Sequence, residues 1–154
     1  MELMSQFLTG GIIQMELEFN QNTIGLIAKK INESVGTVVQ LVGLKSWTSL
    51  VQKTPVGNPD LWKTKYVPAG YVGGQAKFSW NAQYNKPDTR LPISWGSGNP
   101  TTPKINVSDD YNILFITSSA PHMEALEKGH STQGKHMIKR TVGEINLELK
   151  SALR

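Results

Sequence analysis

Apolar residues recur every three or four positions after Asn20, a spacing that places them on one face of a helix. Asn20 or Asn22 is expected to cap its start, because an asparagine side chain can accept hydrogen bonds from the first backbone N–H groups of a helix. Pro55 disfavours helical geometry at Thr54, so the helix is expected to end near Lys53. The pattern is carried by Ile24, Ile27, Ala28, Ile31, Val35, Val38, Val39, Val42 and Leu50.

A single helix over this stretch would have about thirty residues and would span roughly 45 Å. Such a helix is longer than a small sheet can cover. Its far end is therefore expected to pack on another surface, with a second copy of the chain as one option. Gly25, Gly36 and Gly43 each weaken a helix by up to about 1 kcal/mol relative to alanine. A break or a kink within the stretch therefore stays open.

Alternating apolar and polar residues predict strands later in the chain. Residues 76–82 read AKFSWNA, which puts Trp80 on one face with the alanines and the phenylalanine. Residues 112–118 read NILFITS and form a stronger candidate, and residues 104–107 are expected to form a short strand. Asp109 and Asp110 are expected to make a turn between these last two strands.

The end of the chain predicts an amphipathic helix, because Ile138, Val142, Ile145 and Leu149 repeat at intervals of four, three and four. Residues 54–74 and 84–103 are rich in proline and glycine, show no period, and are expected to be long loops. The order of the elements predicts an α+β fold with an antiparallel sheet. Residues 1–18 are expected to be an N-terminal arm or extension of one α+β domain over residues 19–154.

The composition fits a single domain without covalent cross-links. Among its 154 residues the chain has no cysteine, which excludes disulfides, thiolate metal sites and thiol nucleophiles. No run of 18 apolar residues predicts a membrane-spanning helix, and the N-terminus lacks the features of a signal peptide. The formal net charge is +4, but the basic stretches at residues 63–65 and 135–140 are short, so a solvated basic surface is favoured.

One group of side chains has the types that bind metals. His122, His130 and His136 lie within fifteen residues of one another, together with Glu124 and Glu127. Their spacing matches no metal motif, and exposed or locally hydrogen-bonded histidines are favoured. No metal or cofactor is therefore expected.

A hydrolytic triad can also be drawn from Ser118 or Ser119, His122, and Asp109 or Asp110. The sequence lacks the G-x-S-x-G turn that would expose a serine nucleophile, and its glycine pairs lack the lysine of a phosphate-binding loop. We therefore expect no enzymatic activity.

Aromatic residues interleaved with lysines suggest an alternative function as a small DNA-binding module, since aromatic rings stack on bases. Trp80 shares the apolar face of its predicted strand, however, which favours a place in the core. The pattern consists of Trp62, Tyr71, Trp80 and Tyr84 with Lys63, Lys65, Lys77 and Lys86.

Two longer stretches together resemble one protein family. Residues 53–82 read KTPVGNPDLWKTKYVPAGYVGGQAKFSWNA, and residues 116–145 read ITSSAPHMEALEKGHSTQGKHMIKRTVGEI. The ordered succession of a TPV motif, a glycine turn, a tryptophan strand, an LE-x-G segment, a Ser/Gln loop and a final helix resembles the tail-completion or neck proteins of tailed bacteriophages. The shared motif residues are Thr54, Pro55, Val56, Gly70, Tyr71, Gly73, Gly74, Trp80, Pro121, Leu126, Glu127, Gly129, Ser131, Gln133 and Met137.

The resemblance covers about residues 19–149, and the chain departs from the family pattern at His122, Met123 and Gly134. It implies a non-enzymatic virion protein that passes through the host cytoplasm during assembly. Identical subunits would form a ring at the head-to-tail junction that closes the filled head and docks the tail, next to other connector, portal-adaptor or tail proteins. Lysines and arginines could line the lumen of such a ring and attract DNA phosphates without reading sequence.

The interface residues expected of such a subunit lie in the loops and the last third of the chain. Aromatic side chains in polar loops are typical interface anchors, although Trp62 and Trp95 could equally fold back onto the subunit's own sheet. The expected interface residues are Trp62, Tyr71, Trp95, Glu127 and Gln133.

Overall fold

A four-stranded antiparallel sheet forms one layer of the molecule. The computed structural model describes residues 3–8, 12–61, 66–67, 69, 71–88, 90, 100–107, 113–129 and 131–154, with residues 3–8 and 12 described as backbone. Across the sheet the strands lie in the order β1, β2, β4, β3. They are β1 (Leu3–Leu8), β2 (Ile12–Glu18), β3 (Trp80–Tyr84) and β4 (Ile113–Ser118).

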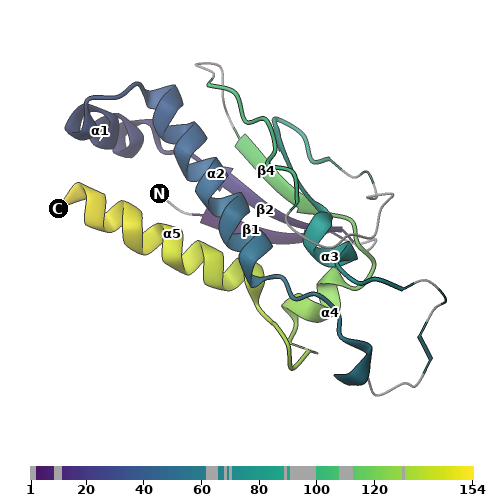
Figure 1. The fold of residues 1–154 in the computed structure, drawn as a ribbon. Helices are drawn as coiled ribbons and strands as arrows, with labels where there is room; N and C mark the ends of the chain where they lie inside the picture. Colours follow the sequence, from purple (N-terminus) through teal and green to yellow (C-terminus); the bar gives the residue numbers. More distant parts are fainter. Residues whose placement is uncertain are drawn as a thin grey trace.

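Helices form the second layer (Figure 1), in which α2 and α5 lie side by side across one face of the sheet and α1 packs against both. This arrangement confirms the predicted α+β fold, its antiparallel sheet and its C-terminal amphipathic helix. The helices are α1 (Gln21–Ile31), α2 (Val35–Lys53), α3 (Gln75–Phe78), α4 (Met123–Glu127) and α5 (Met137–Leu153), with a 3₁₀ turn η1 (Pro59–Leu61).

Alternation along the strands separates an apolar face of the sheet from a polar one. Met15 of β2 pairs with Ile116 of β4, and both side chains are fully buried beneath the helices. The neighbouring pair, Gln14 and Thr117, faces the other way. On that side the hydroxyl of Thr117 donates to the backbone oxygen of Asp88 at 2.6 Å, so the segment after β3 crosses the polar face.

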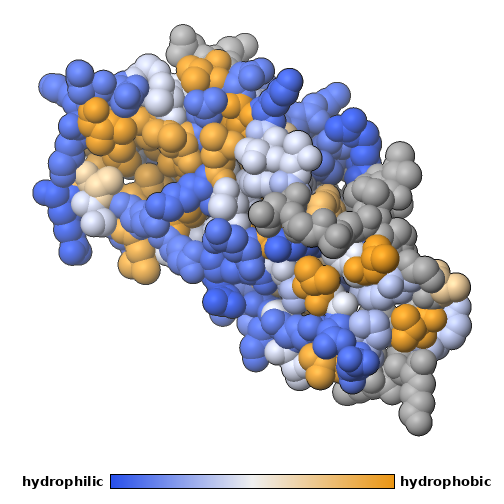
Figure 2. All heavy atoms as spheres, in the orientation of Figure 1, coloured by the Kyte–Doolittle hydropathy of each residue, from blue (hydrophilic) through white to orange (hydrophobic). Residues whose placement is uncertain are grey.

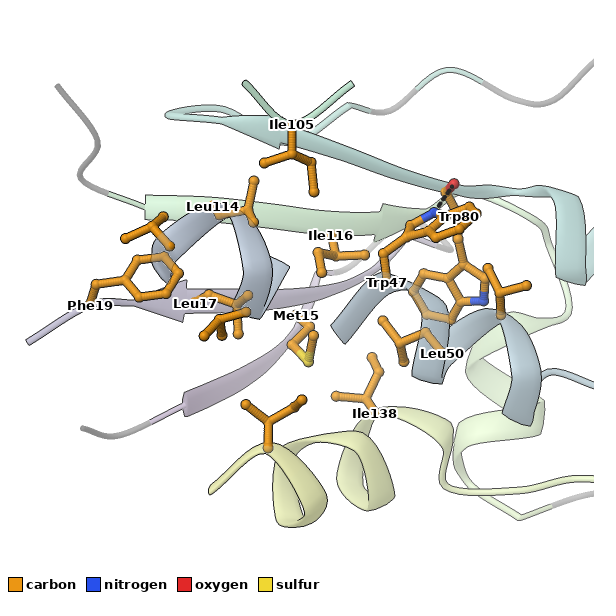
Figure 3. Packing of buried hydrophobic residues seen from close by; sticks show 14 of the residues in the cluster. Met15, Leu17, Phe19, Trp47, Leu50, Trp80, Ile105, Leu114, Ile116 and Ile138 are labelled. Atoms are coloured by element: carbon orange, nitrogen blue, oxygen red, sulfur yellow. Dashed lines mark hydrogen bonds between the residues drawn. The ribbon is translucent and has the colours of Figure 1, made fainter. Parts of the chain in front are cut away.

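The core lies between the sheet and the two long helices (Figure 3). Leu50 of α2 and Ile138 of α5 point toward Met15 of β2, and all three side chains are buried. Trp47 of α2 lies beside Trp80 of β3, and its Nε1 donates to the backbone oxygen of Trp80 at 3.0 Å. Because burial of each large apolar side chain contributes about 1.5–3 kcal/mol, this contact between the layers holds the fold together.

The N-terminal residues belong to the sheet. We expected residues 1–18 to be an arm outside the domain, but β2 lies between β1 and β4 and pairs with both. Ile13, Met15 and Leu17 are buried against the helices. The boundary expected at residue 18 therefore falls inside the unit that carries the core.

The long N-terminal helix is divided in two. Asn20 caps α1 as predicted, with its Oδ1 accepting from the N–H of Thr23 at 3.1 Å, and α2 ends at Lys53 as predicted. The break is at Asn32, which adopts a left-handed conformation with φ 57°, and Ser34 then caps α2. A left-handed residue after a helix is a common stop signal. The single 45 Å helix was therefore wrong, and with it the argument that its length alone demands a second copy.

Two predicted strands differ from the structure. Residues 75–78 form the short helix α3, because Gly74 with φ 82° turns the chain before them, and the strand begins only at Trp80. Residues 104–107 form no strand. Instead Ile105 is buried and its backbone oxygen accepts from Nε2 of Gln40 at 2.6 Å, which fastens this segment to α2.

A loop projects from the end of the molecule at which α2 terminates (Figure 1). We call its described residues, 55–61, 66–67, 69 and 71–73, the projecting loop, and η1 is the one helical turn among them. This agrees with the long loop predicted over residues 54–74. Among the described helices none combines the length and the hydropathy of a membrane span.

Candidate assembly interface at the projecting loop

Thr54 fastens the start of the projecting loop to the core. Its hydroxyl donates to the backbone oxygen of Leu50 at 2.7 Å and accepts from Nε1 of Trp80 at 2.7 Å. Trp80 is itself bonded to Trp47, so α2, the loop and β3 share one buried network. These hydrogen bonds satisfy the polar atoms of two buried indoles and fix the direction in which the chain leaves α2.

Pro55 packs tightly against the segment before α5. A Cβ on Gly134 would lie 2.8 Å from Cδ of Pro55 and 3.2 Å from the backbone oxygen of Lys53. Only a residue without a side chain permits this approach. The family pattern departs from this chain at Gly134, and here the glycine brings the two sequence stretches into contact.

Gln133 joins the same two stretches by hydrogen bonds. Its Nε2 donates to the backbone oxygen of Val56 at 3.2 Å, and its Oε1 accepts from the N–H of Asn58 at 3.2 Å. The side-chain amide thus pairs with the loop backbone as a neighbouring strand would. Gln133, predicted as an interface residue, supports the projecting loop from within the chain.

Gly73 and Gly74 return the chain from the projecting loop to α3. Both have positive φ, at 72° and 82°, and a Cβ on Gly73 would lie 2.9 Å from Cγ1 of Val56. The hydroxyl of Tyr71 donates to the backbone oxygen of Gly57 at 3.5 Å, and burial raises the pKa of this phenol. The two ends of the loop therefore touch at its base.

Glu127 caps the last helix. Its carboxylate is buried and accepts from the N–H groups of Ile138 at 2.9 Å and Lys139 at 3.1 Å, in the first turn of α5. Nδ1 of His136 donates to the backbone oxygen of Glu127 at 2.6 Å. An acidic group at a helix N-terminus also meets the positive end of the helix dipole. Glu127, which we predicted as an interface residue, thus uses both carboxylate oxygens inside the fold.

Gly129 makes the turn that brings α4 back toward α5. Its φ is 85°, and a Cβ there would lie 3.3 Å from the ring of His136. The left-handed conformation and the nearby ring of His136 explain why a glycine occupies position 129.

The side chains considered above for a hydrolytic triad or a metal site make local contacts where the structure describes them. Ser119 donates to the backbone oxygen of Arg90 at 2.7 Å, and the hydroxyls of Ser118 and Ser79 contact each other. His122 is exposed ahead of α4, and no group of three metal-binding side chains occurs in the described part of the chain. His130, Asp109 and Asp110 lie outside the described residues.

Charged side chains near the loop pair along the helices. Nζ of Lys53 lies 2.5 Å from the carboxylate of Glu144, and this hydrogen bond holds the pKa of Glu144 below its usual range. Lys45 and Glu148 form a second ion pair between α2 and α5. Both pairs lie on the helical layer.

The described part of the projecting loop exposes apolar side chains, of which the sequence analysis had singled out only Val56. Tyr66 is 74% exposed and Leu61 60%. The signal in the sequence is a set of apolar residues without period in a segment rich in proline and glycine. The exposed apolar residues of the loop are Val56, Leu61, Tyr66, Val67 and Val72.

Several other predicted residues lie outside the described part of the chain, namely Trp62, Lys63, Lys65, Gly70 and Trp95. The predicted motif residues Thr54, Pro55, Gly73 and Trp80 lie at or near the base of the loop, and Gly129 lies beside His136 before α5. Compared with protein-family models, with curated proteins and with solved structures, the chain has no significant match.

Proposed function

We propose that this protein is a structural subunit of the head-to-tail junction of a tailed bacteriophage, where identical copies form a ring that closes the head and docks the tail. The observation that carries the proposal is the projecting loop, whose described residues expose five large apolar side chains above a base held by hydrogen bonds. Several exposed apolar side chains gathered in one segment favour association, because burial removes them from water.

The base of the loop supports the resemblance on which the proposal also rests. The two stretches that resemble the neck family are separated by more than thirty residues of sequence, yet they meet where Gln133 pairs with the loop and Gly134 contacts Pro55. The shared residue Gln133 thus holds the loop in place, whereas Gly134, which departs from the family pattern, adds a close backbone contact. A surface that must fit a partner benefits from such preorganisation.

The experiment that tests the proposal removes the gene from the phage genome that encodes the chain. Filled heads and finished tails are expected to accumulate unjoined, and the wild-type chain supplied in trans is expected to restore joined particles. Val107→Asp, at an exposed position outside the loop, is the control and should restore them equally well. Joined, infectious particles formed without the chain would overturn the proposal.

A DNA-binding module is the second candidate, and one observation favours it. The exposed glutamates of α5 pair with lysines of α2, and four further exposed cations lie on α5 and at its C-cap. These are Lys139, Arg140, Lys150 and Arg154. If this surface binds duplex DNA, the logarithm of the association constant falls linearly with the logarithm of salt concentration, and Lys150→Glu with Arg154→Glu weakens binding.

A further inference from the structure

Exposed apolar side chains gather in two places on the described part of the chain. Five lie on the projecting loop and five on helices α1, α2 and α5, with Val107 as the one large example elsewhere. On the helices Leu26 is 62% exposed and Leu147 69%. We call the second set the helical patch, which consists of Leu26, Ile31, Leu41, Leu147 and Leu153.

The two sets lie toward opposite ends of the molecule. In Figure 1 the projecting loop extends beyond α4, whereas α1 and the end of α5 lie at the other extreme. Figure 2 shows apolar surface over α1 and the first turns of α2, apolar surface again on the loop, and a hydrophilic band between them. One chain therefore carries two separated apolar surfaces.

The size of each surface is close to what an association needs. At roughly 100 Å² of exposed surface for each large apolar side chain, five side chains expose about 500 Å², against about 800 Å² that each partner buries in a standard interface. Polar rim residues supply the remainder in ordinary interfaces.

We propose that the projecting loop of one copy docks on the helical patch of the next copy. This pairing rests on the proposed function, because it specifies the surfaces by which identical subunits form the ring. A contact between two different patches is heterologous, and repeated copies joined in this way close into a ring when the rotation between neighbours allows it. A second copy of the chain always offers the surface that this contact needs, because every copy has both a projecting loop and a helical patch.

The helical patch is suited to receive a loop. Leu26 lies on the side of α1 opposite its buried residues, and Leu41 lies on an exposed side of α2, so both side chains are available without unfolding of the helices. The loop presents Leu61 and Val72 on a base fixed by Gln133 and Gly73. The base of the loop is therefore ordered before contact.

The test uses two double variants of the full chain. Leu61→Asp with Val72→Asp disables the loop, and Leu26→Asp with Leu41→Asp disables the helical patch. The mass of each protein in solution is measured by light scattering after size exclusion. The wild type is expected to form a large symmetric oligomer, and each double variant to be monomeric, with an association constant lower by at least about a hundredfold.

Mixing the two double variants decides between pairing schemes. One intact loop then meets one intact helical patch, so the mixture is expected to form one-to-one dimers and nothing larger. A loop-to-loop or patch-to-patch contact predicts no new dimer. Val107→Asp is the matched control and should assemble as the wild type does, while circular dichroism and thermal unfolding show that all variants are folded.

The proposed pairing is overturned if either double variant assembles as the wild type does, if the mixture stays monomeric, or if the wild type is monomeric at high concentration. These outcomes leave the role at the head-to-tail junction to be judged by the gene-removal experiment. Conversely, joined particles formed without the chain would overturn that role and leave the measured contact between copies intact.

Discussion

Glu127 illustrates how one side chain can determine the position of a helix. Its buried carboxylate accepts two backbone N–H groups at the start of α5, where His136 has a left-handed φ of 55° and supplies no side-chain cap. Unsatisfied N–H groups at a buried helix end are costly. Glu127 thereby links α4 to α5 and, through the segment between them, to the base of the projecting loop.

Replacement of Glu127 by alanine is expected to lower the free energy of unfolding by about 1–2 kcal/mol, the range found for lost helix caps. Glu127→Gln keeps one oxygen acceptor and should lose less. Urea unfolding followed by circular dichroism measures the difference. Glu124→Ala is the control, because Glu124 is half-exposed and pairs only with Lys128 on its own helix. An effect of Glu127→Ala no larger than that of Glu124→Ala would contradict the capping role.

Asp88 gives a prediction about pH. Hydrogen bonds from the Arg90 side chain hold the pKa of this carboxyl below its usual value of 3.8. A lowered folded-state pKa stabilises the protein above the unfolded-state pKa, and the contribution disappears as the pH falls through the folded-state pKa. Asp88→Asn should therefore be less stable than the wild type at pH 7, and the difference should shrink toward pH 2. A difference that persists at pH 2 would argue against the ion pair.

At the scale of elements, glycines in the two long helices have opposite surroundings. A Cβ on Gly43 of α2 would lie 2.4 Å from Cδ2 of the buried Leu114, whereas nothing lies within 4 Å of the Cβ position of Gly143 in α5. The first glycine permits the close approach of α2 to β4. The second is an exposed helical glycine with no packing reason in the single chain.

This contrast predicts opposite effects of the same substitution. Gly143→Ala should raise the free energy of unfolding by about 0.5–1 kcal/mol, because alanine has the higher helix propensity. Gly43→Ala should lower it by about 1 kcal/mol or more, since overpacking exceeds that gain. Thermal unfolding of both variants beside the wild type checks the signs. Stabilisation by Gly43→Ala would show that Leu114 and Ile105 yield more readily than their burial indicates.

At the scale of the whole molecule, the apolar character of both proposed contact surfaces predicts how assembly responds to salt. Apolar contacts do not depend on screened charges, so raising the salt concentration tenfold should leave the oligomer intact or strengthen it. Attraction of DNA to the cations on α5 and at its C-cap should weaken under the same change. Sedimentation and DNA binding measured across one salt series separate the two. Dissociation of the oligomer by salt would indicate a contact held by ion pairs.

The sequence by itself determined the elements whose signals are local. The cap at Asn20, the end of α2 before Pro55, the strand ending at Ser118 and the amphipathic α5 all follow from propensity, capping and periodicity within a few residues. The class of fold follows from their order. The same local rules failed where a signal was ambiguous, as at Asn32, which can serve in a helix or end one.

Only the tertiary structure decided how distant segments are used. The N-terminal residues pair with β4 in the sheet. The alternation of Ile13, Met15, Leu17 and Phe19 with polar residues is a local strand signal that the sequence analysis missed, but only the fold shows which strand β2 pairs with. Gln133 and Gly134 meet the projecting loop, and Glu127 caps a helix eleven residues away, through contacts that depend on the packed layers. The two apolar surfaces at opposite ends likewise exist only once the chain is folded, because exposure is a property of packing and not of sequence spacing.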